Sequence, residues 1–81
     1  IISQIVRSGT SIGANYMEAN GASSKKDFRN KIFICKKEAQ ETKHWLRMLS
    51  RANSELDVNL VCKECRELIL IFQKIVSSLD K

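Results

Sequence analysis

The sequence predicts an all-α fold, an antiparallel up-and-down helical bundle of three helices in a single domain that spans residues 1–81. The chain has no proline and only three glycines, so the residues that build the turns of a sheet protein are scarce. Apolar residues recur at alternating spacings of three and four, which is the period of a helix that packs through one face. The breaks between helical segments are short, and short connections make neighbouring helices pack antiparallel.

The first helix is expected to run from the start of the chain to about Asn20, because Asn20-Gly21 is typical of a left-handed helix stop. Residues 1–22 contain two charged side chains, Arg7 and Glu18, although 28% of the whole chain is charged. A helix of this composition has almost no face suited to water. We therefore expect it to be packed on several sides.

Two glycines, Gly9 and Gly13, stand four residues apart inside this helix. Each costs about 1 kcal/mol relative to alanine in a helix interior, so close approach of another backbone must offset the pair. A phosphate-binding glycine loop would need a preceding strand and a following Gly-Lys-Ser or Gly-Lys-Thr, and the sequence has neither. The glycines are therefore predicted to mark a close-packed contact, within the bundle or between subunits.

The second helix is expected to begin after Ser24, which is placed to cap it, with Asp27 three residues later in the position of a capping box. Its apolar residues follow spacings of four and three and form one heptad seam. The seam comprises Phe28, Ile32, Cys35, Ala39, Thr42, Leu46 and Leu49.

A third helix repeats this pattern after a break at Asn53-Ser54, where Ser54 and Asp57 are expected to form another cap. Its predicted seam comprises Val61, Cys65, Leu68, Phe72, Ile75 and Leu79. The three helices together are expected to form one core without an internal repeat or a linker.

Hydropathy and cysteine usage predict a soluble, cytoplasmic protein without membrane association. No apolar run approaches the roughly 18 to 20 residues of a membrane span, and no signal-peptide pattern opens the chain. The three cysteines are an odd number at apolar positions, which favours reduced thiols over a disulfide framework. The chain begins with Ile1-Ile2 in full hydrophobic rhythm, which suggests that a preceding segment is absent.

Polar residues of the first helix carry a recognisable motif with the spacing Q-x-x-R-S-x-x-S-I-x-x-N-x-x-E. The residues that match it are Gln4, Arg7, Ser8, Ser11, Ile12, Asn15 and Glu18. The motif resembles the signature of the bacterial four helix bundle family, also called 23S rRNA intervening sequence proteins. The resemblance covers most of residues 1–50 and fades in the third helix. It continues through Ser24, Lys25, Lys26, Asp27, Phe28, Lys37, Glu38, Ala39, Glu41, Thr42, Trp45 and Leu46.

The resemblance implies a four-helix up-and-down protomer, often assembled as a ring-like homopentamer, without known enzymatic activity or a cofactor. A related group, the accessory proteins of diversity-generating retroelements, forms similar basic barrels that bind nucleic acid and a reverse transcriptase. The family's first helix, which precedes the motif, has no counterpart in this chain. Either that stretch is cut off or another protomer fills the gap.

Polar residues of the first two helices are predicted to form a lock that sets the register between them. Steps of three and four residues place four side chains of the first helix on one face: Arg7, Ser11, Asn15 and Glu18. In an antiparallel pair with a tight turn at residues 21–24, Arg7 lies level with Glu38, and Glu41 is nearby. A guanidinium there would satisfy carboxylates on a semi-buried stripe. A catalytic carboxylate pair would leave the matched arginine unexplained and has no nucleophile.

Cys62-x-x-Cys65 suggests a zinc site, with Cys35 and His44 as distant candidate ligands. Structural zinc pairs normally lie on a turn, whereas these two thiols fall in the middle of a helix. Cys35 is a seam position, and His44 falls on the outer side of the second helix. We therefore expect no metal site and no Cys/His catalysis, and interpret the cysteines as small buried hydrophobes.

The net charge of +5 is concentrated in the second helix, because residues 24–52 hold nine of the fourteen Lys and Arg and only three acids. The basic side chains outside the seam form one continuous cationic face. Six of them are candidate nucleic-acid-binding residues: Lys26, Arg29, Lys36, Lys43, Arg47 and Arg51. Contacts of this kind bind phosphate without reading bases, and they weaken as the salt concentration rises.

Three interpretations of this surface stay open: contact with the phosphate backbone of RNA or DNA, charge-mediated docking to a protein partner, and a purely structural assembly. No exposed aromatic row interleaves the basic residues, which disfavours a stacking platform for single strands. An enzyme would need a cleft with convergent titratable groups, and the sequence offers none. The best interpretation is a non-enzymatic, homo-oligomeric bundle whose basic helix contacts nucleic acid.

Overall fold

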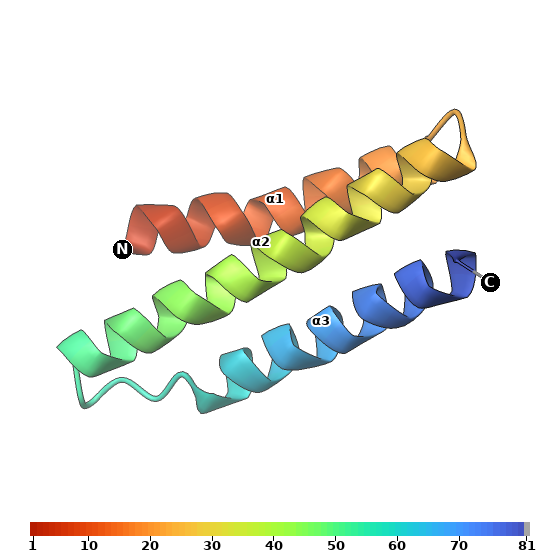
Figure 1. The fold of residues 1–81 in the computed structure, drawn as a ribbon. Coiled ribbons are helices and arrows are strands. Elements are labelled where there is room, and N and C mark those ends of the chain that lie inside the picture. The colour runs from red at the N-terminus through yellow and green to blue at the C-terminus, as the bar shows by residue number, and fades with distance from the viewer. Residues whose placement is uncertain (81) are drawn as a thin grey trace.

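The computed structural model of the chain describes residues 1–80 and consists of three antiparallel helices (Figure 1). Helix α1 spans Ile2–Asn20, α2 spans Lys25–Ala52 and α3 spans Asn59–Leu79. The described residues contain no strand, so the predicted all-α up-and-down fold is confirmed. Within the same residues, no helix has the length and apolar character that a membrane crossing requires.

Helix α2 is the central element, with α1 on one side of it and α3 on the other (Figure 1). The backbones of α1 and α3 are not in contact anywhere in residues 1–80. The body is therefore flat, with extents of 45 × 23 × 13 Å. This arrangement leaves the sides of α1 and α3 that face away from α2 without a helical neighbour.

The start of α2 follows the predicted cap. Ser24 has an extended backbone, and its Oγ accepts a hydrogen bond from the backbone N–H of Asp27 at 3.0 Å. Asp27 also places a negative charge in the first turn, where the helix dipole stabilises it. These two contributions explain why the chain passes from loop to helix at Lys25.

Helix α1 ends at Asn20 as predicted, but the predicted left-handed stop is wrong. Gly21 has a φ of −98°, and none of the described residues has a positive φ. The N–H of Gly21 instead donates to the carbonyls of Met17 and Glu18, at 3.3 and 3.2 Å. The helical hydrogen bonding thus continues one residue into the turn, so the chain needs no left-handed residue there.

The predicted cap of α3 is also wrong, since the helix begins at Asn59 and its N-cap position is Val58, which has no side-chain acceptor. Asp57, rather than Ser54, makes the local contact, because its Oδ1 accepts a hydrogen bond from the Asn59 N–H at 2.9 Å. An aspartate side chain that bonds two residues ahead forms an Asx turn. That turn, rather than a capping box, directs the chain into α3.

The apolar seam of α2 forms the core against both neighbouring helices. Ile32, Cys35 and Ala39 have no exposed surface, and they cluster with Ala19 of α1 and Phe72 of α3. A second cluster lies nearer the α2–α3 turn and consists of Leu46, Val58, Cys62 and Cys65. The predicted seam of α2 is therefore the interior of the molecule, with half-buried residues at its two ends.

Helix α3 is rotated relative to the seam that the spacing predicts. Cys65 and Phe72 are buried as expected, but Val61 is 48% exposed and Cys62 takes the buried position instead. Farther along, Val76 is buried where Ile75 was predicted to be. Apolar residues surround much of this helix, so the spacing alone does not distinguish the inward side from a neighbouring one.

Helix α1 is far less enclosed than predicted. Only Ser8 and Ala19 are buried, while Ile2, Val6 and Met17 are all more than half exposed. The prediction of packing on several sides is wrong for the single chain, because α2 is the one helix whose backbone lies against α1. The nearly uncharged composition of α1 therefore leaves an apolar surface open.

Candidate functional site

A line of basic residues, here called the basic edge, follows the boundary between α2 and α3. It consists of Arg29, Lys36, Lys43, Arg47 and Arg51 of α2 and Arg66 of α3. Because the two helices are antiparallel, residues farther along α2 lie beside residues nearer the start of α3. Arg29 lies beside Asp80, Lys36 beside Gln73 and Lys43 near Cys65. Arg47 and Arg51 lie across from Arg66. The sixth predicted residue, Lys26, is exposed near the start of α2. Five of the six predicted basic residues thus lie beside α3, with Arg47 and Arg51 exposed to solvent.

One end of the basic edge is already compensated within the chain. Arg29 Nε and Nη2 donate to the two carboxylate oxygens of Asp80, at 2.9 and 3.2 Å. The hydrogen bond raises the pKa of Arg29 and lowers the pKa of Asp80. Lys36 donates to Gln73 Oε1, and both Arg29 and Lys36 lie over the ring of Phe33. This end is therefore tied to α3 and has less charge to offer a ligand.

The other end of the basic edge carries charge without a counterion. Lys43, Arg47, Arg51 and Arg66 form no ion pair with any carboxylate in residues 1–80. Arg66 was missed by the sequence analysis, which treated the basic face as a property of α2 alone. The sequence carried no signal for it, because the predicted seam placed Val61 inward, whereas Arg66 lies on the side of α3 that follows from the burial of Cys62, four residues earlier.

Three of these cations surround a pocket of about 230 Å³ beside the α2–α3 turn. Arg47 and Arg51 line it from α2, and Arg66 lines it from α3. Asn59, at the first turn of α3, adds an amide to the wall, and Ser50 adds a hydroxyl. The pocket is thus a concave site with three arginines in its wall.

The predicted polar lock is present in part. Arg7 of α1 lies between two carboxylates of α2, with its Nη1 at 3.4 Å from Glu38 Oε2 and its Nη2 donating to Glu41. The Glu38 side chain is only 9% exposed, whereas the Arg7 side chain is 52% exposed. Trp45 Nε1 also donates to Glu41 at 3.3 Å. The ion pairs place Arg7 level with Glu38, in the predicted register.

The other predicted members of the lock make different contacts. Asn15 Nδ2 donates to the backbone carbonyl of Ser11 at 2.9 Å, so both residues are engaged within α1. Glu18 pairs with Lys31 at 2.8 Å, and this hydrogen bond raises the pKa of Lys31. Of these three residues, Glu18 is the one that forms an ion pair with α2, so the lock between the two helices is formed by Arg7, Glu38 and Glu41.

A buried hydroxyl pair was missed by the sequence analysis. Ser8 has no exposed surface, and its Oγ accepts a hydrogen bond from Thr42 Oγ1 at 2.8 Å and donates to the Gln4 carbonyl at 2.8 Å. Thr42 was assigned to the apolar seam because of its position. The sequence signal for this pair was a small polar residue in the inward stripe of each helix, Ser8 in α1 and Thr42 in α2. Their small side chains let α1 and α2 lie close together.

The cysteines lie in the core, as small hydrophobes would. Burial raises the pKa of the Cys35 thiol and of the Cys65 thiol, so these two groups stay protonated near neutral pH. Cys35 Sγ lies 3.5 Å from the backbone carbonyl of Ile12. Residues 1–80 contain no gathering of three or more His, Cys, Asp or Glu side chains that could hold a metal ion.

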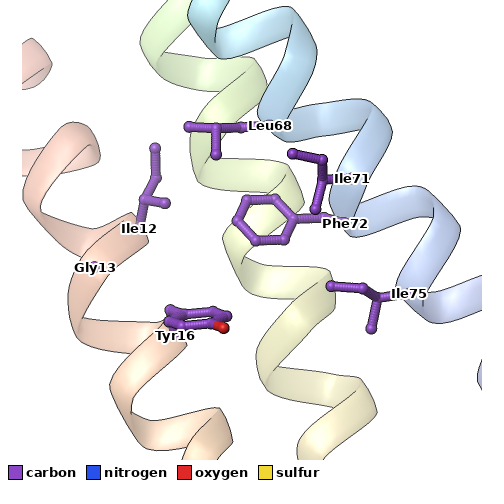
Figure 2. A pocket seen from close by; sticks show the side chains of 7 residues that line it. All are labelled: Ile12, Gly13, Tyr16, Leu68, Ile71, Phe72 and Ile75. Carbon is purple, nitrogen blue, oxygen red and sulfur yellow. The ribbon is translucent and has the colours of Figure 1, made fainter.

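An apolar groove of about 360 Å³ separates α1 from α3, on the side where the bundle has no fourth helix (Figure 2). Phe72, which is buried, forms its floor, and half-buried or exposed side chains form its walls. The lining residues are Ile12, Gly13 and Tyr16 of α1 and Leu68, Ile71, Phe72 and Ile75 of α3.

The two glycines of α1 lie on this open side. A Cβ atom added to Gly9 or to Gly13 would meet nothing within 4 Å. A close contact within the chain, which was one part of the sequence prediction, is therefore wrong. Contact with another subunit, the other part, stays a prediction.

Similarity to known proteins was found over most of the chain. Residues 1–74 match the profile of the family described as 23S rRNA-intervening sequence protein. The chain is also similar to a 1.70 Å crystal structure of a protein with unknown function from the S23 ribosomal protein family of Bacteroides thetaiotaomicron, with 40% identity and a TM-score of 0.86. That match covers 91% of this chain and 70% of the other chain. A comparison with curated proteins found no match.

Replacing Arg7 with methionine is expected to lower the free energy of unfolding by roughly 1–2 kcal/mol, because the nearly buried Glu38 carboxylate loses its guanidinium partner. Urea unfolding followed by circular dichroism measures this change. The control Lys63→Met, at an exposed position without an ion pair, is expected to change stability by less than about 0.5 kcal/mol. Adding Glu38→Gln to Arg7→Met should recover part of the loss. Equal effects of Arg7→Met and the control would contradict the lock.

Proposed function

The chain belongs to the 23S rRNA-intervening sequence protein family, and we propose that it is a non-enzymatic bundle protein that binds nucleic-acid phosphates through its basic edge. The observation that carries this proposal is the unpaired end of the edge, formed by Lys43, Arg47, Arg51 and Arg66. Four cations from two helices gather there without a neutralising carboxylate. Such a surface attracts polyanions, and release of their counterions favours binding.

The chemistry of the edge suits the phosphate backbone better than the bases. Arginine and lysine donate hydrogen bonds to phosphate oxygens, and such contacts carry little sequence information. Among residues 1–80, Phe33 is the aromatic residue over which basic side chains of the edge lie, with Arg29 at 4.9 Å and Lys36 at 5.9 Å from the ring centroid. The edge therefore lacks the aromatic row on which successive unpaired bases would stack.

Binding rather than catalysis also fits the titratable groups. The carboxylates near the α1–α2 contact are engaged by Arg7, and the thiols of Cys35 and Cys65 are buried with raised pKa values. A nucleophile needs a base within hydrogen-bonding reach and access to a substrate. These groups lack both features, so they support a structural role.

We also propose that the protein self-associates through α1. The stripe of Ile2, Val6, Gly9, Gly13 and Tyr16 runs along the open side of this helix, and its apolar members are exposed in the single chain. Exposed apolar patches of this kind mark interaction sites in soluble proteins. The absence of any neighbour at the two glycines leaves room for a second backbone to approach them. The same surface would also accept a helix of a different protein. Measuring the oligomeric state of the purified protein distinguishes a second copy of this chain from such a partner.

Reversing two charges of the basic edge, Lys43→Glu with Arg47→Glu, is expected to abolish retention of duplex nucleic acid at low salt. Fluorescence anisotropy with a labelled duplex measures the affinity. For the unmodified protein, log affinity should fall with log salt with a slope of about −3 to −4, because four side chains replace counterions. The matched control, Lys63→Glu with Lys74→Glu, changes the net charge equally at positions outside the edge and should keep most of the affinity. No binding by the unmodified protein at low salt would overturn the proposal and leave docking to a protein or a purely structural assembly.

Gly13→Leu is expected to keep the chain folded but shift it toward the monomer, because a Cβ at this position meets no atom within 4 Å in one chain, whereas a leucine would obstruct a second backbone. Circular dichroism measures folding, and sedimentation velocity measures assembly. The control Ala14→Leu adds a leucine at an exposed position one residue off the stripe and should leave assembly intact. An unmodified protein that sediments as a monomer, or a Gly13→Leu variant with unchanged assembly, would contradict self-association through the stripe.

A further inference from the structure

The pocket beside the α2–α3 turn differs from the rest of the basic edge, because its cations come from both helices. Arg47 and Arg51 stand one helical turn apart on α2, and Arg66 faces them from α3. Ser50 and Asn59 supply uncharged hydrogen-bonding groups, and the buried Cys62 contributes to the floor. A volume of about 230 Å³ is sufficient for a small anion but not for a base pair.

The charges in this pocket are not balanced by the protein itself. Arginine remains protonated at every physiological pH, so the three guanidinium groups hold three permanent charges. No carboxylate lines the pocket. Asp57, on the adjoining loop, directs its Oδ1 to the backbone N–H of Asn59 instead. Repulsion among the three guanidinium groups is screened by water at these exposed positions, and an anion in the pocket would lower it further.

The number and geometry of the donors favour one class of anion. A guanidinium donates two parallel hydrogen bonds, which match the spacing of phosphate oxygens. A phosphomonoester presents three free oxygens and nearly two negative charges near neutral pH, whereas a diester within a strand presents two oxygens and one charge. Three arginines around a concave site therefore suit the monoester better.

We propose that the pocket of Arg47, Arg51 and Arg66 binds a phosphomonoester, the terminal phosphate of a nucleic-acid strand whose backbone lies along the basic edge. The proposal rests on the function proposed above for the strand, and it adds a preference for strand ends. A free phosphate would use the same donors. A terminal phosphate and a free phosphate differ in one respect: the strand attached to the terminal phosphate also contacts the basic edge and adds to its affinity.

The test compares two duplex DNA oligonucleotides of identical sequence, one with a 5′-phosphate and one with a 5′-hydroxyl, by fluorescence anisotropy at low salt. The 5′-phosphate duplex is expected to bind about tenfold more tightly, as one additional charge-assisted hydrogen-bonded group would give. Arg66→Gln should remove this preference, and it should weaken binding of the 5′-hydroxyl duplex only by the loss of one backbone contact, with the salt slope smaller by about 1. Lys74→Gln, which loses the same charge on the same helix away from the pocket, should keep the preference. Arg66→Lys should restore it only in part, because lysine lacks the fork geometry.

Equal affinity of the unmodified protein for both duplexes would overturn the pocket proposal while leaving the basic edge as a backbone-binding surface. If neither duplex binds, the function proposed above is overturned, and with it the strand-end site. A titration with inorganic phosphate, followed through the arginine Nε–H signals by NMR, identifies the source of the ligand in that case. Shifts at Arg47, Arg51 and Arg66 that saturate in a titration with inorganic phosphate would support a phosphate pocket, and their absence would overturn it.

Discussion

The burial of one apolar stripe of α2 between two other helices is the interaction on which the rest of this structure depends. Ile32, Cys35 and Ala39 lose all contact with water, and the helices on either side meet them with Ala19 and Phe72. Full burial of one large aliphatic side chain is worth roughly 1.5–3 kcal/mol, whereas an exposed ion pair contributes less than about 1 kcal/mol. The polar contacts therefore select the register of helices that the stripe has already brought together. Both candidate surfaces follow, since the basic edge lies along one boundary of α2 and the apolar groove opens where α1 and α3 stand apart.

The central helix could be predicted from the sequence because its inward side is marked twice. Apolar residues repeat at helical spacing, and a high density of charge occupies the opposite side, so one orientation buries the seam with Glu38 as the one buried charged residue of α2. Helix α3 has no such contrast. Cys62 and Val61 are adjacent, similar in polarity and equally compatible with the repeat, and packing against α2 decides which of them is buried. The left-handed stop of α1 and the cap of α3 were mispredicted because they depend on the backbone hydrogen bonds of Gly21 and on the Asx turn of Asp57, which residue type alone does not reveal.

For the candidate surfaces too, the positions of residues within one helix could be predicted from the sequence, whereas features formed between helices could not. The positions of Arg47 and Arg51 on α2 follow from spacing, and Arg7 opposite Glu38 follows from the rise of two antiparallel helices joined by a tight turn. Arg66 could not be assigned, because its contribution depends on how α3 is rotated. The exposure of α1 could not be predicted either, since its uncharged composition fits equally well with burial in the chain and with burial against a partner. In each case the missing information is the placement of a neighbouring helix.

Native-state hydrogen exchange tests the central position of α2 most directly. Amides that open only by global unfolding exchange most slowly, and they lie where packing encloses the backbone from more than one side. We expect the slowest exchange in the middle of α2, between Ile32 and Leu46, with faster exchange along α1 and α3. Protection that is greatest in α1 or α3, or equal in all three helices, would contradict an account in which one helix holds the other two.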